Sequence, residues 1–248
     1  MTEPQIIEVS PIKVEKPVII IGLPGVGLVG VISSIVLVDS QKMKNVGYVE
    51  SNLIPPVVIL HKGKIFDPIR VYNRNNILLI TSEIPIPTEM VRPLARSIVG
   101  WAKKKDPRLI LMLGGINTPN RIDIEEPKCY IVKTNDRTEE LLKKVKVEEL
   151  SEGIMVGPYP MILRESLKEG LPAVAILAQA YGRYPDPGAA ASVLKALSKL
   201  LEIKVNVNEL LEKAEETRLK MRDLMRRTNQ TMRRMGKEQE LEVPAMYV

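Results

Sequence analysis

The sequence predicts an α/β protein, with one three-layer domain whose helices cover both faces of a largely parallel, mixed sheet. Continuous apolar runs such as Val18–Ile21 and Leu109–Leu113 are typical of strands that are buried on both faces. Between these runs lie segments whose apolar residues recur every three or four positions, as they do in amphipathic helices. The chain of 248 residues is 45% hydrophobic, which is enough for one core of this kind.

The predicted strands are short apolar segments bounded by Gly, Pro, Asn or charged residues. They cover residues 14–21, 45–50, 57–60, 65–72, 77–81, 109–113, 128–133 and 173–179, with a further strand inside 153–163. The segments 57–60 and 65–72 are expected to form a hairpin around Lys62–Lys64. A second turn is expected at Asn73–Asn76, because Asn tolerates left-handed geometry. The sheet therefore receives one antiparallel insertion near residues 57–81.

The predicted helices follow these strands. They cover residues 32–38, 88–104, 138–145 and 188–201, with one more at the end of 153–163. Thr88 is expected to cap the second helix, and Asn135 or Asp136 the third. The second helix has a core-facing stripe that consists of Val91, Leu94, Ile98 and Trp101. Trp101 is therefore expected in the core or an interface rather than against a ligand.

The C-terminal part of the chain is predicted to be a separate unit. Residues 1–204 form the globular domain, 205–240 a long charged helix from about Val207 to Gln239, and 241–248 a flexible tail. The helix has an apolar seam with four-three spacing, interrupted by Arg218 and Thr228. Its members are Val207, Leu211, Ala214, Met221, Met225, Met232 and Met235. Such a seam is typical of an imperfect coiled coil or of a helix between subunits.

The second half of this helix is strongly basic. From Arg218 to Lys237 it holds eight basic residues and one acidic residue, Asp223. A basic face can bind nucleic acid, and such binding would weaken steeply with salt. Charge runs usually lie in solvent, and the chain has no recognised nucleic-acid-reading motif. A solvated face on an oligomer-forming helix is therefore favoured, and a nucleic-acid partner is not expected.

Cysteine and histidine are each present once. The single cysteine, Cys129, excludes an intramolecular disulfide and is expected to be a small buried hydrophobe. One cysteine and one histidine, His61, are too few for a Cys/His zinc site within one chain, so no metal is expected. The start Met1–Pro4 lacks a signal pattern, and no apolar run reaches about 18 residues. We expect a cytoplasmic protein without a membrane segment.

A glycine-rich loop follows the first buried strand. Gly25, Gly27 and Gly30 fit the pattern G-x-G-x-x-G, which can place a phosphate at a helix N-terminus. Glu50 lies 20 residues after Gly30, at the end of the next strand, as a dinucleotide site would require. The alternative is a tight turn and close helix packing without a ligand. Pro24 and the lack of further nucleotide signals favour packing, so no cofactor is expected.

An enzyme acting on a nucleoside or a phosphate ester is the alternative function. The loop 22–30 would then hold the phosphate, and Glu83, His61 or Asn117 would act as acid, base or positioning group. No nucleophile–base pair can be named among these residues. The adjacent acids Glu125–Glu126 precede a proline and are expected to lie in an exposed turn. We therefore expect no catalytic residues.

The last three residues, Met246, Tyr247 and Val248, are a hydrophobic residue, a tyrosine and a terminal residue with a free carboxylate. Pro244 prevents the preceding segment from being helical. A pocket with cationic or backbone donors suits such an end, because it can bind the carboxylate while the ring supplies apolar contact. The ending resembles the hydrophobic-tyrosine-any motif of proteasome activators, which inserts between α-subunits of the 20S proteasome.

Three further stretches resemble the archaeal family of proteasome-assembly-chaperone homologues. They are residues 17–30, residues 112–116 and the loop-to-helix segment 182–191, and the long C-terminal helix is a fourth similarity. The resemblance covers roughly residues 10–235. It implies a fold like that of purine nucleoside phosphorylase without an established nucleosidase activity, and it implies a homo-oligomer, for which we favour a tetramer over a pentamer.

The resemblance also implies a function. The chain is expected to be a non-enzymatic protein that binds the 20S proteasome α-subunits through Met246, Tyr247 and Val248, as an activator, an assembly chaperone homologue or both. No G-x-x-x-x-G-K-[ST] motif is present, so this action is expected to be independent of ATP.

Overall fold

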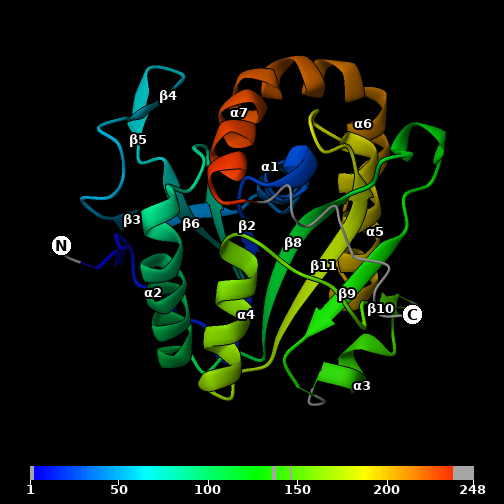
Figure 1. Ribbon diagram of the computed structural model, residues 1–248. Helices are drawn as coiled ribbons and strands as arrows, with labels where there is room; N and C mark the ends of the chain where they lie inside the picture. Colours follow the sequence, from blue (N-terminus) through cyan, green and yellow to red (C-terminus); the bar gives the residue numbers. More distant parts are fainter. Residues whose placement is uncertain (1–2, 136–137, 146, 237–248) are drawn as a thin grey trace.

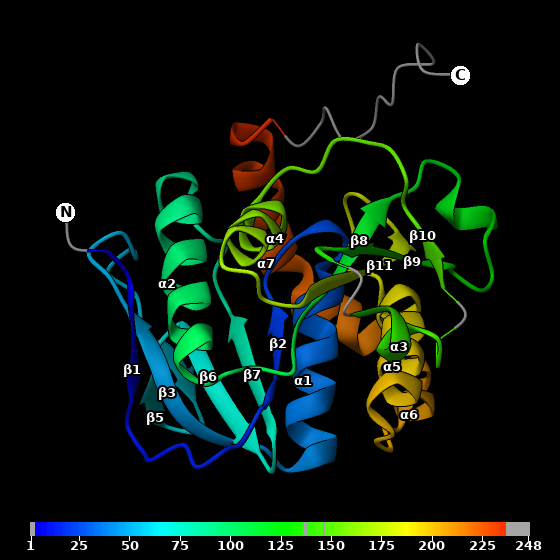
Figure 2. The same ribbon diagram turned by 90° about the horizontal axis from the view of Figure 1, so that it is seen from below.

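The computed structural model of this chain describes residues 3–135, 138–145 and 147–236. Nine of its strands form one sheet, in the order β1-β3-β6-β7-β2-β8-β11-β9-β10. Figure 1 shows this sheet with helices on both sides, and Figure 2 shows the layers after a turn of 90°. The strands are β1 (Gln5–Glu8), β2 (Val18–Gly22), β3 (Lys44–Glu50), β6 (Ile69–Arg74), β7 (Ile77–Ser82), β8 (Leu109–Asn117), β9 (Cys129–Lys133), β10 (Glu148–Glu149) and β11 (Ala173–Ala180).

The centre of the sheet is parallel. Strand β2 pairs in parallel with both β7 and β8, and β8 pairs in parallel with β11. Antiparallel pairs flank this centre, namely β1–β3, β3–β6 and β6–β7 on one side and β9–β11 on the other. The predicted mixed α/β sheet with a parallel core of apolar strands is therefore confirmed.

Helices complete the two outer layers. Helices α2 (Val91–Lys104) and α4 (Pro158–Lys168) lie on one face, while α1 (Val29–Gln41) and α5 (Pro187–Leu201) lie on the other (Figure 2). The shorter elements are α3 (Glu139–Leu142), α6 (Val207–Glu212) and the 3₁₀ turns η1 (Val26–Leu28), η2 (Thr88–Met90) and η3 (Arg121–Asp123). The C-terminal helix α7 (Ala214–Arg234) crosses one end of the sheet (Figure 1). Among the helices in the described ranges, none is long and apolar enough to span a membrane.

The two apolar clusters of the core follow from the alternation of side chains along each strand. Ile20 is in register with Leu79 and Leu111, and all three belong to the cluster under α1 and α5. Their neighbours Ile19, Leu78 and Ile110 belong to the cluster under α2 and α4. Because both faces are covered, these strands are apolar at every position.

Several predicted elements were wrong in detail. The segment 65–72 is two strands, because Asp67-Pro68 separates β5 (Lys64–Phe66) from β6. Strand β5 pairs with β4 (Ile59–His61) in a separate two-stranded sheet, so only β6 joins the main sheet. Residues 153–157 form no strand and lead directly into α4. Strand β1 was not predicted.

The predicted helix cap at Thr88 was wrong, whereas the cap predicted at Asn135 or Asp136 stays a prediction. Thr88 is the first residue of η2, and the preceding Pro87, whose φ is fixed by its ring, sets the boundary without a side-chain bond. The residue at the N-terminal boundary of α3 is Thr138, and its hydroxyl donates to the carbonyl of Asn135 at 2.8 Å instead of capping the helix. Asp136 lies outside the described residues.

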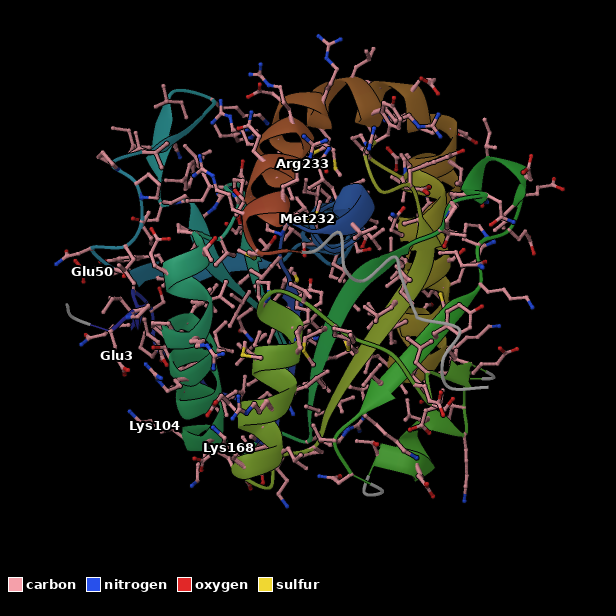
Figure 3. The ribbon with its side chains drawn as sticks, viewed as in Figure 1. Glu3, Glu50, Lys104, Lys168, Met232 and Arg233 are labelled. Atoms are coloured by element: carbon pink, nitrogen blue, oxygen red, sulfur yellow. The ribbon has the colours of Figure 1, made fainter. Side chains whose placement is uncertain are left out.

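The long C-terminal helix is present but broken. Lys213, with φ −96° and ψ 21°, separates α6 from α7, and α7 ends at Arg234 rather than near Gln239. Its seam packs on this chain's own core, because Met225 and Thr228 are buried and Met221 and Met232 pack against the cluster under α1 and α5. Figure 3 labels Met232 on the last turns of α7. Thr228, expected to interrupt the seam, belongs to its packed face, and a contact of this helix with another chain stays a prediction.

Candidate functional site

The glycine-rich loop connects β2 to α1 at the carboxyl end of the central strands. Its backbone turns through η1, where Gly27 has φ 62° and Leu28 has φ 50°, and α1 then begins at Val29. The N–H of Leu28 donates to the carbonyl of Gly25 at 3.0 Å. A glycine at position 27 removes the steric cost of the left-handed conformation. The predicted strand, glycine turn and helix are therefore observed.

Most glycines at this end of the sheet make room for protein atoms. A β-carbon on Gly30 would lie 2.5 Å from the carbonyl oxygen of Leu113 and 2.7 Å from the hydroxyl of Tyr159. One on Gly114 would lie 2.7 Å from the Tyr159 ring. By contrast, Gly25 has nothing within 4 Å of that position. These contacts favour the packing interpretation of Gly30, and the phosphate-loop alternative for Gly25, Gly27 and Gly30 stays a hypothesis.

Tyr159, near the start of α4, joins the two central strands. Its hydroxyl accepts a hydrogen bond from the N–H of Leu23 at 2.9 Å and donates one to the carbonyl of Leu113 at 2.5 Å. Burial raises the pKa of the Tyr159 phenol, so the ring stays neutral. Because this neutral hydroxyl makes two hydrogen bonds to the backbone, its role is structural, and it does not act as a catalytic proton donor. No local pattern in the sequence indicates this role of Tyr159, because its partners lie 136 and 46 residues away.

A buried ion pair holds the neighbouring loops. Arg121 donates from Nε to Asp186 Oδ2 at 2.8 Å and from Nη2 to Oδ1 at 3.1 Å. The Asp186 side chain is fully buried, and that of Arg121 is 7% exposed. The guanidinium also lies 5.0 Å from the centre of the Tyr181 ring. The cost of burying two charges is offset only because their hydrogen bonds are well satisfied.

Asp186 connects three segments of the chain. Its backbone N–H donates to the carbonyl of Gly27 at 2.8 Å, and its carboxylate accepts from the N–H groups of Tyr181 at 3.1 Å and Ala189 at 2.9 Å. It therefore caps α5 and fixes the glycine-rich loop at once. Sequence reasoning did not single out this pair. A signal for Asp186 was available, since an aspartate before Pro187 is the usual start of a helix with proline at its first position.

A cavity of about 350 Å³ lies beside Gly25. It opens between the carboxyl ends of β2 and β8, whose connections leave toward opposite edges of the sheet, and this is where open α/β sheets commonly bind ligands. Its lining is mainly apolar and includes Leu23, Val26, Ile116, Ile154 and Met155. Ser151 and Glu152 stand among the few polar side chains. The cavity suits an apolar ligand better than a phosphate.

The residues considered for acid–base roles are not brought together. Glu83 pairs with Arg70, and His61 lies exposed on β4 at the tip of the separate hairpin. Asn117 ends β8, where its amide packs against Gly182. Among the described residues, no group of three or more His, Cys, Asp and Glu side chains could hold a metal. The arrangement supplies no nucleophile and base within reach of one another.

Four further residues lie in surroundings close to those that the sequence suggested. Cys129 is half-buried on β9, and burial raises the pKa of its thiol to about 12, so it behaves as a small neutral side chain. Glu125 and Glu126 are exposed between η3 and β9. Trp101 packs in the core under α2 and donates from Nε1 to Glu8 at 2.8 Å.

Helix α7 closes over the carboxyl end of the sheet. It contacts η1 and α5, and Asn229 donates to the carbonyl of Arg183 at 3.2 Å. Met235, just after the helix, packs against the cluster on the other side of the sheet, under α2 and α4. The helix thus bridges both layers. The residues predicted to dock, Met246, Tyr247 and Val248, lie outside the described residues.

The sequence of this α/β chain matches the model of a known protein family. The model of the PAC2 family matches residues 19–225, and the chain belongs to this family. The Methanocaldococcus jannaschii protein MJ0106 is 29% identical over 94% of this chain and 95% of its own length.

Solved structures give the same assignment. The structure of Pyrococcus furiosus PbaA, an archaeal homolog of proteasome-assembly chaperone, is similar with a TM-score of 0.84 and 29% identity, over 92% of this chain and 98% of that one. The structure of Pyrococcus furiosus PbaB, an archaeal proteasome activator, shares the fold with a TM-score of 0.76 and 23% identity, over 90% of this chain and 99% of that one. The suspected resemblance to this family is therefore confirmed.

Proposed function

We propose that this chain is a proteasome-binding protein that acts without ATP and without catalysis of its own. As a homo-oligomer in the cytoplasm, it would dock C-terminal tails into pockets between 20S α-subunits, as an activator, an assembly chaperone homologue or both. The observation that carries the proposal is the similarity to PbaA, at 29% identity over 92% of this chain, within the PAC2 family. The scattered positions of Glu83, His61 and Asn117 agree with a binding function.

The chemistry of the proposed contact lies in Met246, Tyr247 and Val248. A carboxylate on Val248 would pair with cationic or backbone donors of the receptor, and the Tyr247 ring would add apolar contact and a hydrogen bond. Val243-Pro244 would keep the segment before them extended.

The end of α7 gives this tail a defined starting point. Gly236, with φ 72°, terminates the helix in a left-handed conformation, and its N–H donates to the carbonyl of Arg233 at 3.0 Å. Twelve residues follow, and they can span at most about 40 Å. Several such tails on one oligomer would raise the avidity by ~10² to 10⁴ if they engage several pockets together.

The test is binding to immobilised 20S proteasome, measured with peptide hydrolysis in the same samples. Full-length protein is compared with a chain lacking residues 246–248. A matched control keeps the three side chains but adds one glycine after Val248, which displaces the carboxylate. We expect binding by the full-length protein only, and enhanced hydrolysis would favour activation over assembly. Equal binding by all three chains would refute docking through the tail.

A further inference from the structure

We propose that the β4–β5 hairpin is an arm by which one copy of this chain binds the junction of α6 and α7 on a second copy. The arm comprises residues 58–66, and the junction, called the elbow, comprises residues 207–220. The proposal rests on the homo-oligomer stated under the proposed function, and it specifies the surfaces that would build that oligomer.

The arm exposes a continuous apolar face. Leu60 and Ile65 are directly paired across the two strands and are 71% and 70% exposed. Val58, directly before β4, is 54% exposed. Contiguous exposed apolar side chains of this kind mark interaction surfaces, whereas single ones need no explanation.

The arm receives little support from its own chain. Strands β4 and β5 contact each other, and neither contacts another helix or strand of the described ranges to a comparable extent. Phe66, at the base, lies 5.0 Å from the Arg70 guanidinium, which ties the arm to β6. An isolated two-stranded hairpin is only marginally stable in water, so burial of its apolar face against a partner would stabilise it.

The elbow offers a complementary surface. Leu211 and Leu219 are 43% and 69% exposed there. The exposed acids of this segment, Glu209, Glu212, Glu215 and Glu216, outnumber its bases Lys213, Arg218 and Lys220 by one. The tip of the arm is basic, since Lys62 and Lys64 are exposed together with His61. Apolar side chains would thus meet apolar ones, while lysines meet glutamates.

The present partners of those glutamates do not prevent this contact. Glu215 pairs with Arg218 and Glu216 with Lys220, all on the exposed surface of α7. Exposed ion pairs within one helix contribute little free energy, so their exchange for pairs with the arm costs little.

The positions of arm and elbow make the contact head-to-tail. In Figure 1 the arm stands at one edge of the molecule and α6 at the opposite edge, and Figure 2 keeps them at opposite ends. In a head-to-tail assembly each contact joins the arm of one copy to the elbow of the next copy. Such contacts generate a ring if the rotation between copies closes.

The test uses two full-length variants and a control, each checked for wild-type circular dichroism. The arm variant carries Leu60→Glu and Ile65→Glu, and the elbow variant carries Leu211→Lys and Leu219→Lys. The control is Leu167→Glu on α4, a leucine that is 58% exposed outside both surfaces. Mass is measured by light scattering after size exclusion. We expect each surface variant to fall to the single-chain mass of 27.8 kDa, while the control keeps the wild-type mass.

Mixing the two variants makes the assignment decisive. Each variant keeps one intact surface, so an equimolar mixture should form a complex of two chains and no ring. A mixture that stays monomeric, or a surface variant that keeps the wild-type mass, overturns the arm–elbow contact. A monomeric wild-type protein would instead refute the homo-oligomer itself. Proteasome binding is measured in a separate assay, so the failure of the arm–elbow contact can be distinguished from the failure of the proposed function.

Discussion

The carboxyl end of the central strands and the β4–β5 arm differ in where their side chains find partners. At the carboxyl end, Tyr159 and the Arg121–Asp186 pair bind loops from distant parts of the chain, and most of the glycines there, though not Gly25, are in close contact with protein atoms. On the arm, Leu60 and Ile65 are paired only with each other and are largely exposed.

This difference separates the fold's usual ligand end from the surfaces that remain open to partners. In many α/β proteins the carboxyl end carries the chemistry. In this chain, contacts of Gly30, Tyr159 and Asp186 fill much of the carboxyl end of the central strands, and helix α7 covers part of that end. The arm and the elbow lie at the periphery. A binding protein needs this arrangement, because a rigid body then presents its contacts outward.

The largest loss of stability is expected from Asp186→Ala. This change leaves the Arg121 charge buried without its partner and also removes the cap of α5, so the free energy of unfolding should fall by about 3–5 kcal/mol. Urea denaturation at fixed protein concentration measures the change. Glu169→Ala, which removes an exposed ion pair with Lys103 outside the arm and the elbow, is the control and should stay near wild type. Equal effects of the two changes would contradict the role of the buried pair.

The thiol of Cys129 on strand β9 is expected to react slowly, because it is partly buried. Burial raises the pKa of its thiol from 9.0 to about 12, so at pH 8 the folded protein holds far less thiolate than the unfolded chain. Alkylation by iodoacetamide should be slower in the folded protein by at least ~10². The rate should rise with pH beyond the range in which an ordinary thiol has already ionised. Similar rates in buffer and in 8 M urea would show that the thiol is not held in its neutral form.

A pair of glycine substitutions tests the packing of the loop. Gly30→Ala places a methyl group 2.5 Å from a backbone oxygen and should cost about 2–3 kcal/mol. Gly25→Ala meets nothing within 4 Å, and its φ of −166° is open to any residue, so it should change stability little. Thermal denaturation of both variants compares them directly. If Gly25→Ala were the more damaging change, the loop would not be organised as described.

The smallest of these effects is expected from Tyr159→Phe. The ring still packs against Gly114, but the N–H of Leu23 and the carbonyl of Leu113 lose their partner. A loss of about 1–2 kcal/mol follows from leaving buried polar groups unsatisfied. Denaturant unfolding measures this loss, and an unchanged midpoint would mean that water replaces the hydroxyl.

The sequence predicted the parallel core because local patterns determine it. Val18–Ile21 and Leu109–Leu113 are apolar at every position, and this pattern requires cover on both faces. The roles of Gly30 and Asp186 could not be predicted, since they depend on Tyr159 and Arg121, which are distant in the chain. The packing of the α7 seam on the chain's own core could not be predicted for a related reason: four-three spacing shows that a helix face is buried but not whether its partner is the same chain or another.

The most direct test of the account compares two substitutions in one assay of binding to immobilised 20S proteasome. Tyr247→Ala alters the proposed docking tail, whereas Gly25→Leu fills the cavity at the carboxyl end of the sheet. We expect Tyr247→Ala to weaken binding at least ~10-fold, which corresponds to about 1.4 kcal/mol, and Gly25→Leu to bind like wild type. Loss of binding with Gly25→Leu and none with Tyr247→Ala would contradict this expectation.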